Sequence, residues 1–144
     1  MSRPARPARP EDVDDVCEAL PGTWFGTSWG DVPTWLVQSR ATRKPDDRGR
    51  GFVLYRRPHP SATDPATGEQ WDDLLVVRTP DAGAKTALVD GDGPFFTVDH
   101  FRGSTSVLVR LSRIGELSRE ELVEVLTDAW RTAAPPRLVR EHDA

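Results

Sequence analysis

The 144-residue sequence contains a single cysteine, Cys17, so no disulfide can form within the chain. Structural disulfides belong mostly to oxidising compartments, and their absence favours a reducing, cytoplasmic location. No apolar run reaches the roughly 18–20 residues that span a bilayer, so we expect no membrane partner. The basic N-terminal sequence MSRPARPARP lacks the apolar stretch of a signal peptide.

Signatures of catalysis are also missing. The sequence has no G-x-S-x-G elbow, no H-E-x-x-H motif, no C-x-x-C pair and no glycine-rich nucleotide-binding loop. The histidines His59, His100 and His142 are far apart, and DGDGP at 90–94 lacks the later ligands of a calcium loop. We therefore expect a protein with no catalytic residues, no metal and no other cofactor.

The net charge of −4 disfavours a protein that coats DNA without specificity, because such proteins are usually basic. The charge is unevenly distributed, however. Residues 40–60 contain seven basic side chains against two acids, a local excess of five positive charges. The first five of these cations fall in one polar stretch and are candidates for phosphate contacts: Arg40, Arg43, Lys44, Arg48 and Arg50. The alternative is a charged loop that is merely solvated.

The pattern of apolar residues predicts an α+β fold in one domain. Helices are expected over about 11–20, 80–90 and 118–134, and strands near 23–29, 34–39, 51–57, 73–79 and 107–111. Two stretches rich in turn formers, 40–50 and 58–70, are expected to be loops. Because the strands come in runs, the sheet should be mainly antiparallel, with helices on one side or at its ends. The domain is expected over 11–140, between a flexible Arg/Pro tail at 1–10 and a short tail at 141–144.

Details within the helices support these assignments. Val13, Val16, Cys17 and Leu20 form one apolar stripe, which predicts that the Cys17 thiol is buried and inert. Ser118 and Glu121 have the spacing of a capping box at the start of the last helix, and Pro135–Pro136 should end that helix. In the helix at 80–90, the side chains expected to point inward are Ala84, Ala87 and Leu88.

The segment FFTVDHFRGSTSVLVRL, residues 95–111, leaves two interpretations open. Phe95, Phe96, His100, Phe101 and Arg102 combine aromatic faces with a cation, as in surfaces that stack on nucleic acids. Alternatively, the aromatic residues fill the core and His100 and Arg102 lie at the entrance of a strand. The alternation after residue 105 indicates a strand with one face buried, so His100 and Arg102 are only candidates for contact.

Four segments together resemble the YjbR-like proteins, also called the MmcQ/YjbR family. They are VCEALPG at 16–22, WGDVPTWLV at 29–37, the 95–111 segment and ELVEVLTDAWRTAAPPRLV at 121–139. The resemblance covers about residues 11–140. It implies a two-layer α+β sandwich like those of secretion chaperones and frataxin, and DNA binding through a double-wing arrangement of hairpins. It transfers no catalytic residue.

Two functions follow as expectations. The first is a non-catalytic DNA-binding or regulatory protein that uses the basic loop, with His100 and Arg102 on a second contact edge. The second is a module that binds a protein or a small ligand and has no role with nucleic acids. The second expectation would be favoured by an exposed pocket lined by Trp24, Trp29 and Trp35.

Overall fold

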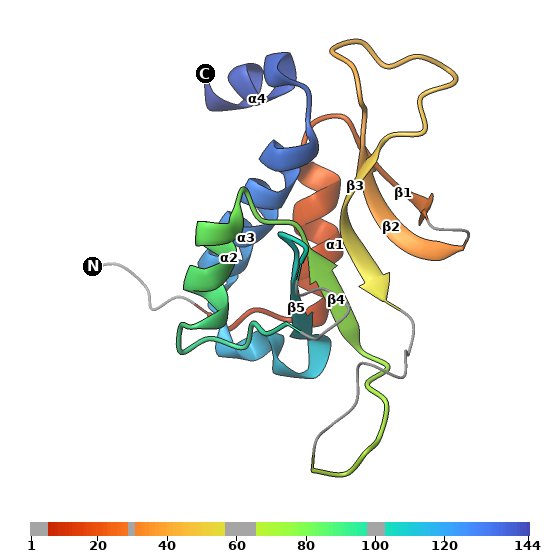
Figure 1. The fold of residues 1–144 in the computed structure, drawn as a ribbon. Coiled ribbons are helices and arrows are strands. Elements are labelled where there is room, and N and C mark those ends of the chain that lie inside the picture. Colours follow the sequence, from red (N-terminus) through yellow and green to blue (C-terminus); the bar gives the residue numbers. More distant parts are fainter. Residues whose placement is uncertain (1–5, 29–30, 57–65, 98–102) are drawn as a thin grey trace.

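In the structure, a computed structural model that describes residues 6–28, 31–56, 66–97 and 103–144, five antiparallel strands form one sheet (Figure 1). The strands pair in chain order: β1 (Thr23–Ser28), β2 (Val32–Val37), β3 (Arg50–Arg56), β4 (Leu74–Val77) and β5 (Val107–Arg110). A bulge in the β2–β3 pairing follows Trp35, which pairs with Val53, while Leu36 pairs with Gly51. The predicted α+β fold with an antiparallel sheet is confirmed.

Helices α1 (Pro10–Ala19) and α3 (Arg119–Ala133) cover one face of this sheet. The predicted stripe of α1 packs into the main core, where Val13 and Cys17 are fully buried. From α3, Leu126 and Trp130 are fully buried in the same core. The predicted capping box is also present, with Ser118 Oγ accepting a 3.0 Å hydrogen bond from the Glu121 amide.

The other face of the sheet carries a second, smaller apolar cluster. Leu74, Val76 and Leu108 are buried there, with Trp71 and Phe96 packed against them. The expectation that 107–111 buries only one face is therefore wrong, because Leu108 is as buried as Val107 and Val109 on the core side. The strand also ends at Arg110, since residues Leu111–Glu116 form a 3₁₀ helix, η2.

Helix α2 (Ala82–Val89) lies beside β5 and begins at Asp81, whose carboxylate accepts a 2.8 Å hydrogen bond from the Ala84 amide. Its inward face differs from the prediction. Lys85 is buried and its Nζ donates to the carbonyl oxygen of Ser104, whereas Ala87 is exposed. The hydrogen bond explains the burial, because the ammonium group exchanges water for a backbone acceptor.

The N-terminal arm, residues 6–9, packs on the body of the fold, although the sequence places it in a flexible tail. Ala8 is buried, and its amide donates to the Leu117 carbonyl oxygen at 2.9 Å. The Arg119 amide donates in turn to the carbonyl oxygen of Arg6 at 2.9 Å. These bonds occupy backbone groups at the start of α3. The arm is therefore packed as part of the domain, which was expected to begin at residue 11.

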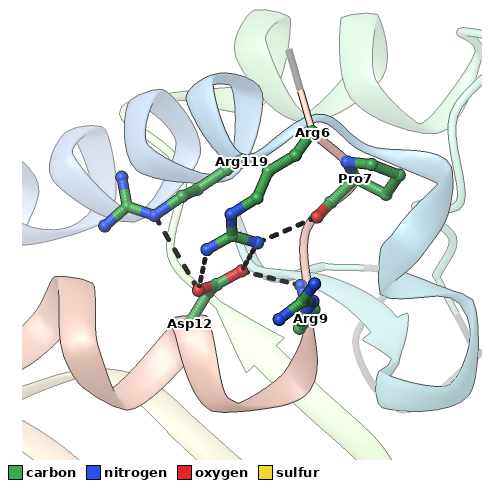
Figure 2. Close-up of polar contacts among 5 residues, drawn as sticks. All are labelled: Arg6, Pro7, Arg9, Asp12 and Arg119. Atoms are coloured by element: carbon green, nitrogen blue, oxygen red, sulfur yellow. Dashed lines mark hydrogen bonds and ion pairs between the residues drawn. The ribbon is translucent and has the colours of Figure 1, made fainter.

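An ion pair also holds the arm in place. The guanidinium of Arg6 forms two hydrogen bonds with the carboxylate of Asp12, at 2.8 and 2.7 Å (Figure 2). The same carboxylate accepts the Arg9 amide at 2.8 Å, and Arg119 Nε lies 3.8 Å away. The buried carboxylate of Asp12 thus joins the arm, α1 and the start of α3.

Residues 141–143, expected in a C-terminal tail, belong to a fourth helix, α4 (Pro136–Asp143). Pro135 and Pro136 do end α3, but Pro136 is also the first residue of α4, a position where the missing amide hydrogen is no loss. Leu138 anchors α4 in the core, and the His142 ring lies 5.0 Å from the Trp130 ring. No helix within the described ranges combines the length and apolarity needed to cross a membrane.

Candidate functional site

The strongest concentration of positive charge is the basic loop, which we define as residues 38–50 between β2 and the start of β3. The cations predicted to contact phosphate are exposed along this single segment: Arg40, Arg43, Lys44, Arg48 and Arg50. These five side chains are therefore accessible to a ligand from solvent.

Asp47 fixes the shape of the basic loop from within. Its carboxylate accepts hydrogen bonds from the amide of Ser39 at 2.9 Å, the hydroxyl of Ser39 at 2.8 Å and the amide of Gly49 at 2.8 Å. Partial burial raises the pKa of Asp47, but these hydrogen bonds outweigh it and hold the pKa below its usual value. The carboxylate therefore stays ionised and closes the two ends of the loop together.

Further hydrogen bonds come from the first residue of the loop. The amide nitrogen of the buried Gln38 side chain donates to the carbonyl oxygens of Arg40 at 2.9 Å and Ala41 at 3.0 Å. The Asp47 amide donates to the Lys44 carbonyl oxygen at 3.0 Å. Much of the backbone between the cations is thus held by hydrogen bonds within the loop.

An aromatic contact joins the basic loop to the sheet. The guanidinium carbon of Arg43 lies 3.9 Å from the centre of the Trp24 ring on β1, within the range of a cation–π interaction. Gly49, with a φ of +74°, allows the chain to pass close to the same ring. A β-carbon at Gly49 would come within 2.7 Å of a Trp24 ring carbon, so only glycine fits there without a shift.

The loop surrounds a shallow concavity of about 140 Å³. Its lining is polar and carries both charges: Ser39, Arg40, Lys44, Asp46, Asp47, Arg48 and Gly49. Because Asp47 directs its oxygens into the loop hydrogen bonds, the charged groups that face a ligand from solvent are the three cations and one carboxylate, that of the exposed Asp46. Such an arrangement suits a phosphate group better than an apolar molecule.

Arg78, which the sequence analysis did not single out, extends the positive surface. It follows β4, and its amide donates to the Phe52 carbonyl oxygen at 3.2 Å. Burial lowers the pKa of Arg78, and the positive charge of Arg50 lowers it further. The backbone hydrogen bond places Arg78 beside Phe52, two positions from Arg50, a proximity that only strand pairing reveals.

The structure does not describe the second predicted contact edge. His100 and Arg102 lie outside the described residues, as does Phe101. Phe95 is buried in the main core, and the Phe96 ring packs edge-on against Trp71 at 5.1 Å. The core interpretation is therefore confirmed for Phe95, whereas Phe96 is partly buried and packs against the smaller apolar cluster.

A second concavity, of about 260 Å³, runs along α2. Its lining includes Lys85, Thr86, Asp90, Ser104 and Thr105. Burial lowers the pKa of Lys85, whose ammonium group already holds the segment at Ser104. Neither concavity is lined by Trp24 or Trp35, and Trp29 lies outside the described residues, so the predicted tryptophan-lined pocket has no support here.

The described part of the chain contains neither a reactive thiol nor a cluster of metal ligands. Cys17 is fully buried, and burial together with the negative charge of Asp14 raises the pKa of its thiol. Such a thiol is a poor nucleophile. Within the same residues, no group of three or more His, Cys, Asp or Glu side chains is arranged to hold a metal ion.

Comparison with known proteins gives the chain a family. No family model matches it, and no solved structure does. Uncharacterised proteins of Mycobacterium tuberculosis (Rv2570 in strain H37Rv) and Mycobacterium bovis (Mb2600) are each 40% identical to it over 127 residues. The match covers 78% of this chain and 93% of each relative. The chain therefore belongs to the same family as these mycobacterial proteins.

Proposed function

We propose that the protein is a non-catalytic DNA-binding or regulatory protein of the cytoplasm, and that its basic loop contacts the phosphate backbone. The observation that carries the proposal is the set of five exposed cations on a loop whose backbone is already ordered by Asp47 and Gln38. A loop ordered before binding loses little conformational entropy when it meets its ligand, which favours affinity.

Charge and chemistry both support a phosphate ligand. Arginine guanidinium groups match phosphate oxygens with paired donors, and four of the five cations are arginines. The acidic remainder of the protein repels DNA, so binding would be limited to the basic surfaces, of which the loop is the main one. The resemblance to YjbR-like proteins points to the same class of ligand, with His100 and Arg102 as candidates for a second contact edge.

The test is fluorescence anisotropy with labelled duplex and single-stranded DNA at several salt concentrations. We expect the triple variant Arg40→Gln/Lys44→Gln/Arg48→Gln to bind more weakly, with a salt slope shallower by about 0.9 for each duplex phosphate that the variant no longer neutralises. These three side chains are exposed, so the fold should survive the change.

A matched control removes the same charge elsewhere. Arg113, Arg137 and Arg140 are exposed on η2 and α4, outside the basic loop, and their replacement by glutamine should leave both the affinity and the salt slope nearly unchanged. Equal losses in the two triple variants would mean that net charge alone attracts DNA. Unchanged binding in the loop variant would refute the assignment of the loop.

A second candidate function, binding of a protein partner without nucleic acid, is favoured by a different surface. Phe25 on β1 is 52% exposed, and it is the one large hydrophobic side chain so exposed among the residues that the structure describes. A single exposed apolar side chain is common on protein surfaces, but Phe25 adjoins the rings of Trp35 and Tyr55, and contiguous apolar surface is typical of interaction sites.

A further inference from the structure

The two edge strands of the sheet differ in how they are protected. On β5 the outer side is occupied, because the amides of Phe96 and Leu108 each donate to the carbonyl oxygen of the other at 2.9 Å. On β1, the described residues provide a pairing strand on one side only, which is β2. The outer edge of β1 therefore offers backbone donors and acceptors to another chain.

The composition of β1 leaves this edge open to pairing. Natural edge strands are usually blunted by charged residues, by proline or by a bulge. The sequence of β1, TWFGTS, contains no charge and no proline, and its pairing with β2 is regular over all six residues. The edge therefore lacks the features that normally prevent the addition of a strand.

Three aromatic side chains, Phe25, Trp35 and Tyr55, form an aromatic shelf beside this edge, on the face of the sheet that α1 and α3 cover. The Phe25 ring lies 5.3 Å from the Trp35 ring and 6.1 Å from the Tyr55 ring. Because Phe25 is at the outermost strand, about half of its surface faces solvent, while Trp35 is buried. A side chain from an added strand would therefore find an apolar neighbour at Phe25.

Acidic residues border the shelf. Asp14 of α1 accepts hydrogen bonds at one oxygen from Trp35 Nε1 at 2.8 Å and from the Tyr55 hydroxyl at 2.6 Å. Glu11 and Glu18 are exposed and lie three and four positions from Asp14, so they share its side of the helix. Helix α1 contains no basic residue that would neutralise this rim.

We propose that the open edge of β1 binds an extended segment of another protein as a sixth strand. The segment would place an apolar side chain on Phe25 and lysine or arginine side chains against the rim formed by Glu11, Asp14 and Glu18. A second copy of this chain suits the surface poorly, because the same acidic rim and a net charge of −4 would face each other.

The test follows backbone amide shifts of the ¹⁵N-labelled protein by NMR. The probes are two acetylated hexapeptides, KTVTKT (the lysine peptide) and ETVTET (the glutamate peptide), in which alternate positions place the valine and both charged side chains on one face of the strand. We expect the lysine peptide to shift the amides of Thr23–Ser28 and the glutamate peptide to bind at least tenfold more weakly. Shifts that spare these residues, or equal binding of both peptides, would overturn the proposal.

Two exposed positions provide matched variants. Phe25→Thr keeps a strand-forming residue and should weaken the lysine peptide at least fivefold. Glu18→Lys should weaken the lysine peptide and strengthen the glutamate peptide. The amide spectra of both variants report whether the fold is retained, and absence of either effect in a folded variant contradicts the proposed surface.

Sedimentation over a range of protein concentrations tests whether a second copy of this chain occupies the β1 edge instead. A dimer of the free protein that Phe25→Thr abolishes would assign the edge to self-association and overturn the proposal. The DNA-binding proposal is independent of this one: the Arg40/Lys44/Arg48 triple variant should keep its peptide shifts, and Phe25→Thr should keep its affinity for DNA.

Discussion

At the scale of single residues, Gly49 decides how the basic loop meets the sheet. Its positive φ reverses the chain beside Trp24, and the space for a side chain is occupied by the indole ring. Arg43 stacks on that same ring, so the position of one cation depends on a glycine six residues away.

We predict that Gly49→Ala destabilises the protein by more than the backbone strain alone, which is about 1–2 kcal/mol. The added methyl group would displace Trp24, and this should change the tryptophan fluorescence and weaken DNA binding. Urea unfolding measures the decrease in stability. Gly68→Ala is the matched control, because Gly68 has a φ of +75° with no atom within 4 Å of the new carbon. Equal decreases at the two positions would contradict the role given to Trp24.

The positively charged stretch itself was predictable at this scale, because Arg40 to Arg50 are close in sequence. The part played by Asp47 was not, since an acid inside a basic stretch gives no sign of accepting three hydrogen bonds. Arg78 was hidden for another reason, as its nearness to Arg50 arises from the pairing of β3 with β4.

At the scale of elements, the periodicity of apolar residues located α1 and α3, and runs of apolar and aromatic residues located the five strands. It failed where a distant partner decides burial. Lys85 is buried because the carbonyl oxygen of Ser104, nineteen positions away, accepts a hydrogen bond from its ammonium group. The N-terminal arm was missed because Arg-Pro repeats carry no periodic signal, although Asp12 fixes the arm.

We predict that this arm makes stability depend on pH through Asp12. The hydrogen bonds from Arg6 outweigh the opposing effect of burial and, with the Arg9 amide, lower the pKa of Asp12 to about 2 from 3.8. A lowered pKa means that the stabilisation is present above about pH 4 and disappears as the pH falls towards 2. Asp12→Asn should cost about 1.5–3 kcal/mol at pH 7, because it removes hydrogen bonds to a charged group.

Urea unfolding at pH 7 and at pH 2.5 measures this difference. The cost of Asp12→Asn should shrink at the lower pH, whereas Asp128→Asn, an exposed partner of Arg131 at 3.7 Å, should cost less than about 1 kcal/mol at either pH. An Asp12→Asn cost that is the same at both pH values would show that the ionised carboxylate is not what holds the arm.

At the scale of the whole molecule, Cys17 reports on global stability, because its side chain on α1 is fully buried against the rest of the core. We predict that a thiol reagent labels the native protein more than about a thousandfold more slowly than the urea-unfolded protein, since domains unfold only rarely. A Cys17→Ser/Glu120→Cys variant, with its thiol on an exposed position, should react at once. Fast labelling of native Cys17 would instead reveal local opening of α1.

The covering of the sheet by α1 and α3 also has a consequence during synthesis on the ribosome. The two helices contact each other, yet 100 positions separate Ala19 from Arg119. At about 5–20 residues per second, roughly 5–20 seconds pass between the emergence of one helix and the other. Throughout that interval the apolar face of the nascent sheet lacks the cover that α3 provides, so the growing chain should be a substrate for chaperones until α3 appears.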